Sequence, residues 1–385
     1  MTNKQQKNPN KKPCLWIHCA SLGEFEQGRT IIEALKKQNP NIYIWLTFFS
    51  PSGYEIRKNF PLADTITYLP LDTPANARDF LQIVQPNFVI FVKYEHWYFY
   101  LQALKKQAIP TYLISAFFRP QQIFFKPQGF FFREILSLYK HIFVQNQASK
   151  KLLEQIELHN VTITGDTRFD RVCQNAQQTT IHLHHIAAFK KHRTLIVAGS
   201  TWQKDEELLA KIIDNSYLNN FCWIIAPHET HQANLKRIET IFQKTKKTII
   251  RYSKIASLPP PNSASTEPNI LLIDNIGMLS SIYQYANYAY IGGGFGKGIH
   301  NILEPAVFGM PVYFGTNYRK FQEANELIAL NGAFSVKNSS ELLSLLQKHQ
   351  KNTPEYENIC QTSKKYVSDG KGATEKIIQH ILPKN

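Results

Sequence analysis

The chain has few cysteines, and none of them stands in a spacing typical of a metal or redox site. They are odd in number, include no C-x-x-C pair, and are Cys14, Cys19, Cys173, Cys222 and Cys360. Three of them lie inside or beside apolar runs. We therefore expect reduced thiols packed in the core of a cytosolic protein, and no zinc site.

Long hydrophobic runs are absent as well. No apolar stretch approaches the roughly 20 residues that a membrane-spanning helix needs. Residues 1–12 are polar and carry lysine, and no hydrophobic segment of a signal peptide follows them. The sequence therefore predicts no secretion signal and a disordered lead over residues 1–12.

Acidic side chains are outnumbered by basic ones, 29 against 44, which gives a net charge of +15. This surplus favours an anionic partner such as nucleic acid, an acidic membrane surface or a phosphorylated substrate. A soluble protein that is simply rich in lysine has the same charge. The 43% hydrophobic content indicates a globular chain, and the length of 385 residues indicates two domains.

Strand-like and helix-like segments alternate along the chain in two series. Strand-like runs such as 42–49 are separated by amphipathic runs, which predicts parallel sheets with helices on both faces. The alternation breaks over residues 171–192. We expect an α/β protein with two doubly wound, Rossmann-like domains, 13–175 and 190–360, and a C-terminal helix in residues 361–385 that crosses back to the first domain.

A glycine-rich segment, residues 292–305, follows a strand-like run. Five glycines fall within seven residues, and Pro305 fits the first turn of a helix. Backbone N–H groups that face outward from such a turn bind anions, and glycine lets a phosphate approach closely. The segment predicts a site for a nucleotide or sugar phosphate, with a tight turn that needs positive φ as the alternative. It matches neither the dinucleotide fingerprint nor the P-loop.

Acidic residues follow two strands of the first series. Ser21 and Glu24 form an S-x-x-E pair, which is typical of a capping box and also suits a general base at the edge of a sheet. Glu95 follows the strand at 88–92, as either a first-turn carboxylate or a second active-site acid. Because ligands of doubly wound sheets bind at the carboxyl ends of strands, we expect these residues to border an interdomain cleft.

Polar residues follow the strands of the second series in the same way. Ser200 and Thr201 lead into an acidic helical turn, which suits either phosphate contact or capping. His228 and His231 lack a third metal ligand at a suitable spacing, so we expect contact with a phosphate or carboxylate, with a plain surface position as the alternative. Arg319 follows a further strand and suits an anion.

Residues 117–133 hold seven phenylalanines, three cations and two prolines. The prolines disfavour a core helix, and aromatic and basic side chains together suit a membrane surface or an acyl-chain site. Phenylalanines packed beneath the loop are the alternative. Single-stranded nucleic acid is disfavoured because polar base-reading residues are scarce. We assign Arg119, Phe124, Phe125 and Lys126 to acceptor and membrane contact.

Taken together and in this order, these motifs resemble the 3-deoxy-D-manno-octulosonic acid (Kdo) transferases of lipopolysaccharide assembly. The resemblance covers the chain from about Trp16 to its end. The matching segments are HCASLGE at 18–24, EHW at 95–97, GDTRFD at 165–170, Ser200-Thr201 with Glu206-Glu207, Pro227-His228, Gly292-Gly293 and HNxxEP at 300–305.

The resemblance implies a GT-B fold, with two Rossmann-like domains and the active site between them. It implies transfer of Kdo from CMP-Kdo to the 6′ hydroxyl of a lipid A precursor, with inversion. It also implies that catalysis uses no metal and no cofactor beyond the donor substrate, and the sequence indeed has no D-x-D motif.

Residue by residue, the resemblance implies that Glu24 is the catalytic base and that Glu95 is a second functional glutamate. Ser21 and Gly23 belong to the same motif, on the acceptor side. The nucleotide side maps onto Ser200, Thr201, His228, Gly292, Gly293, Asn301 and Glu304. From their positions beside these motifs we add His231, Gly294, Lys297 and Arg319 to the donor site.

The chain departs from the family pattern in three places. The usual apolar anchoring segment before the first strand is absent, which predicts either a truncated sequence or peripheral association with the cytoplasmic face of the inner membrane. The usual Pro-Arg-His is Ala226-Pro227-His228, so Arg319 or Lys297 is expected to supply the missing cation. The basic residue near the turn at 115–116 is displaced to Arg119.

Two other functions remain open from the residues alone. One is a different GT-B enzyme, either a UDP-sugar transferase or a UDP-sugar epimerase. The other is a basic nucleic-acid-binding protein, against which the dispersed acids and the motifs at strand ends argue. The expected partners are therefore CMP-Kdo, a lipid A precursor and an anionic membrane surface, with no nucleic acid.

Overall fold

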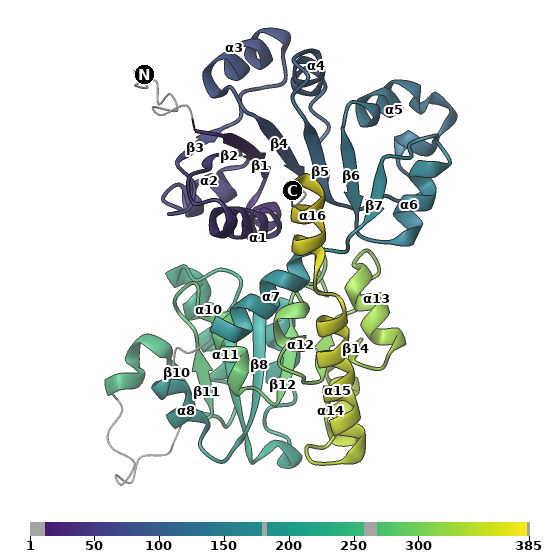
Figure 1. Cartoon of the computed structure of the whole chain (residues 1–385). Helices are drawn as coiled ribbons and strands as arrows, with labels where there is room; N and C mark the ends of the chain where they lie inside the picture. The colour runs from purple at the N-terminus through teal and green to yellow at the C-terminus, as the bar shows by residue number, and fades with distance from the viewer. Residues whose placement is uncertain (1–11, 179–182, 258–267, 383–385) are drawn as a thin grey trace. The chain divides into compact units, whose positions relative to one another are not determined.

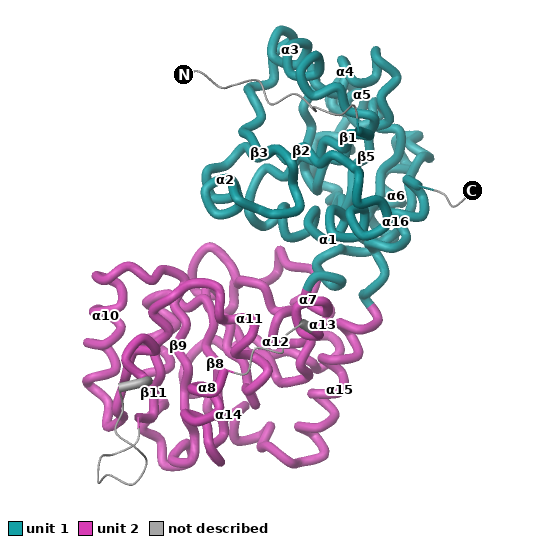
Figure 2. The backbone as a smooth tube through the Cα atoms, turned by 60° about the vertical axis from the view of Figure 1, so that its left-hand side comes forward, with its two compact units in different colours: residues 1–171, 370–385 teal, residues 172–369 magenta. Residues whose placement is uncertain are grey.

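The computed structural model describes residues 12–178, 183–257 and 268–382 (Figure 1). The chain forms two compact units, each built on its own sheet (Figure 2). Unit 1 contains residues 1–171 and 370–385, and unit 2 contains residues 172–369. Of the helices described, none has both the length and the apolar character needed to cross a bilayer.

Unit 1 is built on a parallel sheet of seven strands in the order β3-β2-β1-β4-β5-β6-β7. Every residue of β1, β2, β4 and β5 is buried, as expected when helices cover both faces of a parallel sheet. The strands are β1 (Cys14–His18), β2 (Tyr43–Phe48), β3 (Thr65–Tyr68), β4 (Phe88–Val92), β5 (Thr111–Ala116), β6 (His141–Val144) and β7 (Val161–Ile163).

Helices cover the sheet of unit 1 and bury two hydrophobic clusters (Figure 1). One cluster includes Trp16 and Tyr100, and the other includes Phe25 and Ile377. The helices are α1 (Leu22–Gln38), α2 (Pro51–Arg57), α3 (Pro74–Val84), α4 (Tyr98–Lys106), α5 (Phe130–Ser137), α6 (Gln147–Glu154), α7 (Thr167–Gln178), which continues into unit 2, and α16 (Ala373–Ile381), with short 3-10 turns η1 (Ile123–Phe125) and η2 (Pro127–Gly129).

The C-terminal helix α16 is part of unit 1. The two carboxylate oxygens of Asp170 accept hydrogen bonds from the backbone N–H groups of Gly372 and Thr374, each at 2.7 Å. The hydroxyl of Thr374 lies 2.9 Å from that of Thr30 in α1. Since Ile377 is also fully buried, α16 completes the core that α1 begins.

Unit 2 has a second parallel sheet of seven strands, in the order β10-β11-β9-β8-β12-β13-β14. The strands are β8 (Thr194–Thr201), β9 (Phe221–Pro227), β10 (Ile249–Arg251), β11 (Ile270–Leu272), β12 (Tyr288–Ile291), β13 (Val312–Phe314) and β14 (Ala333–Ser335). The helices are α8 (His184–Lys190), α9 (Gln203–Ala210), α10 (Gln232–Phe242), α11 (Leu279–Ile282), α12 (Leu303–Ala306), α13 (Gln322–Ala329), α14 (Ser339–Lys348) and α15 (Pro354–Asp369), with 3-10 turns η3 (Ser216–Leu218), η4 (Tyr252–Ser257) and η5 (Tyr283–Tyr285).

The strand order reverses beside the first strand of each sheet. β1 lies between β2 and β4, and β8 lies between β9 and β12. In open sheets of this kind, ligands bind beyond the carboxyl ends of the strands at such a reversal. The segments that follow β1 and β4 in unit 1, and β8, β9 and β12 in unit 2, are therefore where a site is expected.

Candidate active site

Glu24 lies in the first turn of α1, just beyond β1. Its Oε2 accepts a hydrogen bond from the backbone N–H of Ser21 at 2.8 Å and another from the Ser21 hydroxyl at 2.6 Å. The capping role is therefore confirmed. The other oxygen, Oε1, accepts no hydrogen bond from any residue that the structure describes. Glu24 is half-buried beside the exposed Gly23, so its second oxygen remains open to a ligand.

Glu95 follows β4 and is only 6% exposed. Its Oε2 accepts a hydrogen bond from the indole N–H of Trp97. The same oxygen lies 3.2 Å from Nε2 of His18, off the ideal direction of a hydrogen bond. The hydroxyl of Tyr139 donates to the backbone carbonyl of Glu95. These contacts hold a buried carboxylate in one position at the carboxyl edge of the sheet.

A chain of hydrogen bonds supports His18 from behind. The indole N–H of Trp16 donates to the hydroxyl oxygen of Thr47 at 2.8 Å, and that oxygen lies 2.9 Å from Nδ1 of His18. Because an indole only donates, the Thr47 hydrogen is available to Nδ1. In the tautomer that accepts this hydrogen at Nδ1, the ring hydrogen is on Nε2, which faces Glu95.

Cys19 lies close enough to both Glu24 and Glu95 for their charges to affect the pKa of its thiol. Burial raises the pKa of this thiol well above its usual value, and the negative charges of Glu24, Glu95 and Glu26 raise it further, in that order. Its side chain is fully buried at the end of β1. The structure therefore brings Ser21, Glu24 and Glu95 together at the carboxyl edge of unit 1.

The glycine turn after β12 is shaped by close packing of backbone on backbone. A Cβ at Gly292 would lie 2.3 Å from the carbonyl oxygen of Ser200, and one at Gly294 would lie 2.5 Å from the backbone of Gly315. Gly293 has a φ of 90°, which side chains disfavour. The tight-turn alternative thus explains these three glycines, because β12 must fit against the ends of β8 and β13.

The prediction that the N–H groups of this turn face outward is wrong for several of its residues. The N–H of Gly293 donates to the carboxylate of Asp205 at 2.9 Å, and those of Gly292 and Gly298 donate to backbone carbonyls. The helix that follows, α12, has four residues and cannot build an appreciable dipole. The turn positions its neighbours, and most of its own N–H groups serve the fold.

The acidic turn after Thr201 is also structural. Asp205 caps α9 and accepts from the turn at Gly293, and Glu206 is completely buried. Glu206 accepts from the Thr201 hydroxyl at 2.9 Å and from Arg237 at 2.6 Å. Burial raises the pKa of both acids, and these hydrogen bonds oppose the rise. The buried Thr201 hydroxyl is engaged by Glu206, which favours the capping alternative for this turn, and donor contact by Thr201 stays a prediction.

Asn301 and Glu304 lie together after the glycine turn. Nδ2 of Asn301 donates to Oε1 of Glu304 at 3.2 Å, and Oδ1 of Asn301 accepts from the N–H of Leu303 at 3.1 Å. Both side chains are half-buried, and Pro305 occupies the first turn of α12 as predicted. An amide and a carboxylate held in this way can bind the hydroxyls of a sugar or ribose.

His228 forms part of a stack of aromatic rings that the sequence did not reveal. Its ring centroid lies 4.7 Å from that of Trp202 and 4.5 Å from that of His300, each at an interplanar angle of 27°. The indole N–H of Trp202 donates to Nε2 of His300 at 3.1 Å. His231 is placed differently, because its Nδ1 caps α10 by accepting from the N–H of Asn234 at 3.3 Å. The structure thus separates His231 from the stack in role.

Exposed cations lie around the glycine turn. The ammonium group of Lys320 donates to the carbonyl of Lys297, and Nδ2 of Asn317 donates to the carbonyl of Gly296 at 2.6 Å. The loop after β13 is therefore fastened onto the turn. The side chains of Lys297 and Arg319 are exposed there, where they can meet an anion.

The phenylalanine-rich segment is divided between core and surface. Phe124 is only 4% exposed and packs in the core of unit 1, so its assignment to membrane contact is wrong. Phe125 is half-buried against the same core. The exposed rings are those of Phe130, Phe131 and Phe132, which are 73%, 38% and 37% exposed at the start of α5. The exposed apolar surface therefore lies in α5, two elements after η1, where it was predicted.

Two cations accompany this surface. The guanidinium of Arg119 lies 4.9 Å from the ring centroid of Phe117 and also hydrogen-bonds Tyr94, next to Glu95. Lys126 is exposed between η1 and η2. Arg119 thus links the phenylalanine-rich segment to the loop that carries Glu95.

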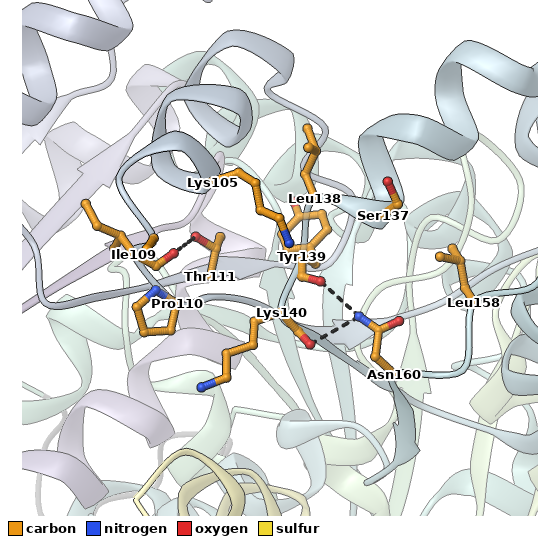
Figure 3. Close-up of a pocket in the computed structure, with 11 residues that line it drawn as sticks. Lys105, Ile109, Pro110, Thr111, Ser137, Leu138, Tyr139, Lys140, Leu158 and Asn160 are labelled. Atoms are coloured by element: carbon orange, nitrogen blue, oxygen red, sulfur yellow. Dashed lines mark hydrogen bonds between the residues drawn. The ribbon is translucent and has the colours of Figure 1, made fainter.

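A pocket of about 610 Å³ opens at the other edge of the unit 1 sheet (Figure 3). Thr111 begins β5 and Lys140 directly precedes β6, so the pocket lies at the amino ends of these strands. Asn160 donates to the carbonyls of Tyr139 and Lys140 in its wall. None of the predicted site residues lines this pocket, and strand polarity places the site at the opposite edge.

Within the described residues, no cluster of three His, Cys, Asp or Glu side chains is placed to hold a metal ion.

Sequence reasoning missed four residues that the structure adds to these sites: His18, Thr47, Trp202 and His300. His18 and His300 lie in matching motifs, but nothing in their spacing indicates which groups they contact. Trp202 directly follows Ser200-Thr201, and an aromatic residue just beyond a strand end is a weak signal by itself.

Comparison with known proteins finds relatives that cover most of the chain. Residues 2–171 match the model of a family described as 3-deoxy-D-manno-octulosonic-acid transferase (kdotransferase). The chain is 28% identical over 345 residues to the 3-deoxy-D-manno-octulosonic acid transferase of Aquifex aeolicus, which covers 88% of this chain and 86% of the relative. It is 25% identical over 379 residues to that of Haemophilus influenzae, covering 96% and 86%.

Among solved structures, the UDP-GlcNAc 2-epimerase of Neisseria meningitidis bound to UDP-GlcNAc has a similar fold. Its TM-score is 0.68 at 16% identity, and the likeness covers 97% of this chain and 100% of that one. Two parallel seven-stranded sheets, each in a Rossmann-like unit, form the architecture of the GT-B fold. The N-terminal part of the chain matches the family model of the 3-deoxy-D-manno-octulosonic-acid transferases, and transferases of that name are similar to the chain over most of its length.

Proposed function

We propose that this enzyme transfers Kdo from CMP-Kdo to the 6′ hydroxyl of a lipid A precursor, with inversion at the anomeric carbon. The observation that carries the proposal is the hydrogen bonding of the Glu24 carboxylate. One oxygen is locked by Ser21, and the other accepts no hydrogen bond within the described part of the chain. A carboxylate that is oriented but not saturated is suited to accept a proton from a ligand.

In this proposal Glu24 removes the proton of the acceptor hydroxyl as the oxygen attacks the anomeric carbon. Glu95 orients the acceptor sugar through its Oε1, since Oε2 already accepts from Trp97 and faces His18. Inversion follows if the base acts on the face opposite the departing CMP.

Unit 2 holds the donor in this proposal. Asn301 and Glu304 bind ribose hydroxyls, and the exposed cations Lys297 and Arg319 stabilise the charge that develops on the leaving phosphate. His228 contacts the phosphate or the sugar carboxylate. Fixed dipoles and cations of this kind lower a barrier because they are already oriented before the reaction begins.

The lipid side is assigned to unit 1. We propose that Phe130, Phe131 and Phe132 insert between acyl chains or headgroups at an anionic membrane, with Lys126 beside them. The net charge of +15 favours both that surface and a phosphorylated acceptor. The enzyme would then act as a peripheral protein at the cytoplasmic face of the inner membrane.

The test is a transfer assay with the full chain, CMP-Kdo and a lipid A precursor, with products weighed by mass spectrometry. The expected product is heavier by one or more Kdo residues, and CMP is released. Thermal shift with CMP and with UDP complements the assay. Stabilisation by UDP alone, without Kdo transfer, would instead support a UDP-sugar enzyme of the same fold.

A further inference from the structure

Three rings meet where the donor half of the site is expected. Trp202 follows β8, His228 follows β9, and His300 follows the glycine turn after β12. These three strands are neighbours at the reversal of the sheet. The backbone N–H of His228 donates to the carbonyl of Thr201 at 3.0 Å, and that of His300 donates to the carbonyl of Gly292 at 3.3 Å. Hydrogen bonds to both strand ends therefore hold the stack in place.

The contact between Trp202 and His300 determines the protonation of one histidine. An indole N–H can only donate, so Nε2 of His300 is the acceptor and carries no hydrogen. His300 is therefore the neutral tautomer with its hydrogen on Nδ1. In agreement, burial and then the charge of His228 lower the pKa of His300 to about 4. At neutral pH, His300 does not compete for a proton with its neighbour.

His228 and Trp202 are the exposed members of the stack, whereas His300 is half-buried. The ring of His228 stacks on both other rings, at 4.7 Å from Trp202 and 4.5 Å from His300. A cation over the face of an indole is stabilised electrostatically. The charged groups nearby are accounted for: Asp205 and Glu206 in the first turn of α9 are buried with partners of their own, and Glu229 contacts His231 at 3.3 Å.

We propose that His228 binds the anionic part of the donor as an imidazolium. Trp202 stabilises this cation through its aromatic face, and His300, which accepts the Trp202 hydrogen bond, stays neutral beside it. The ligand is a phosphate or carboxylate of a nucleotide sugar, and binding is coupled to uptake of one proton. This inference rests on the proposed function for the identity of the nucleotide. It explains how the chain recognises an anion although an arginine is lacking at this strand end.

The test is calorimetry of CMP binding to the full chain from pH 7 to pH 8.5, above the second pKa of the CMP phosphate at about 6, in buffers of different ionisation enthalpy. As the pH rises, the binding constant for CMP should fall, and at the alkaline end it should fall by up to tenfold per pH unit. This is the limit for binding that is coupled to the uptake of one proton. Cytidine, which lacks the phosphate, should bind weakly and without this dependence. Free Kdo shows whether a carboxylate alone suffices.

Two variants of the histidine sharpen the test. His228→Arg carries a permanent charge, so CMP binding should remain but lose its pH dependence. His228→Gln should bind weakly at every pH. His159→Gln, on an exposed histidine in unit 1, is the control and should keep the wild-type profile. A pH dependence that survives in His228→Gln, or one that cytidine shares, would overturn the proposal.

Variants of Trp202 test the platform. Trp202→Phe keeps an aromatic face but loses the N–H, whereas Trp202→Leu loses both. We expect the leucine variant to lose more CMP affinity at pH 6 than the phenylalanine variant, and equal losses would contradict the cation–π role. The two hypotheses fail separately: equal pH-coupled binding of UDP and no Kdo transfer would end the proposed function alone, while pH-independent CMP binding would end this inference alone.

Discussion

Nε2 of His18 lies 3.2 Å from Oε2 of Glu95, and the two side chains are 0% and 8% exposed. His18 is held from behind by Thr47, whose hydroxyl oxygen also accepts from Trp16. A buried carboxylate is costly unless such donors surround it. The relationship therefore ties the position of a proposed active-site acid to the core of the sheet.

Thr47→Val tests this support with a change that hardly alters volume. It leaves the Trp16 N–H and Nδ1 of His18 without a partner, so the free energy of unfolding should fall by roughly 1–3 kcal/mol. Thr47→Ser keeps the hydroxyl and serves as the matched control. Urea unfolding followed by tryptophan fluorescence measures both. Equal stability of the two variants would show that the hydrogen-bond chain contributes nothing.

Glu24→Gln separates the capping role of Glu24 from its proposed catalytic role. A glutamine at this position can still accept from the N–H of Ser21, so the helix start should survive. It cannot accept a proton at neutral pH, and kcat for Kdo transfer should fall by about 10²- to 10⁴-fold. Glu134→Gln, on an exposed glutamate of α5, is the control. Wild-type turnover in Glu24→Gln, with an unchanged melting temperature, would restrict Glu24 to capping.

Substitution by alanine should destabilise the protein at one glycine of this turn and have no effect at another. A Cβ at Gly294 would lie 2.5 Å from the backbone of Gly315, whereas at Gly296 its nearest neighbour would be an oxygen at 3.7 Å. Gly294→Ala should therefore lower the free energy of unfolding by at least about 1–3 kcal/mol and weaken CMP binding. Gly296→Ala should change neither. Thermal melts and calorimetry check both variants, and a tolerated Gly294→Ala would refute the packing explanation.

The membrane assignment predicts a difference between two groups of phenylalanines. Phe130→Ala combined with Phe131→Ala should reduce sedimentation with anionic phosphatidylglycerol vesicles and leave stability nearly unchanged, because both rings are exposed. Phe124→Ala should instead destabilise unit 1 by about 3–5 kcal/mol, as loss of a core ring does.

Ile276→Ala is the control for the vesicle experiment. This residue is 86% exposed in unit 2, away in sequence from α5. Its loss removes exposed apolar area without touching the phenylalanine surface, so vesicle binding should be unchanged. If the double phenylalanine variant also binds vesicles as the wild type does, the surface on α5 is not the membrane contact.

Stability should decrease in mild acid partly because of His141. Burial, and then the nearby His380, lower the pKa of His141 to about 4, below the ordinary histidine value of 6.5. Between these two pH values the unfolded chain binds a proton that the folded chain does not, so stability falls as pH falls. In His141→Gln the slope should be shallower, by less than about 1.4 kcal/mol per pH unit. Urea unfolding at pH 5 and pH 6.5 measures the slope, and a slope equal to that of the wild type would contradict the assignment.

The fold could be predicted because its signals are local and repeated. Strands such as β4 are continuous apolar runs, which identify a parallel sheet covered on both faces. Ser21 and Glu24 are the first and last residues of one four-residue motif, and their contact follows from the geometry of a single helical turn. The corresponding parts of the prediction needed no information about distant residues.

The positions of the phenylalanines could not be predicted in this way. Phe124 and Phe130 stand in the same aromatic and basic segment, yet one packs in the core and the other is exposed. Phe124 lies in η1 and Phe130 begins α5, with η2 between them, and composition does not encode such breaks in the chain. Nor does composition show that the glycines of the turn at 292–294 meet backbone from other strands.

By itself, the sequence determined the two parallel sheets, the capped helix at Glu24 and the resemblance to a transferase family, because periodicity and ordered motifs act over short distances. Only the tertiary structure decided what those motifs touch. Thr47 contacts His18 and His18 contacts Glu95, and both Trp202 and His228 contact His300, from segments that follow or belong to neighbouring strands of each sheet. Such contacts arise from strand order, which is a property of the whole sheet and of no single segment.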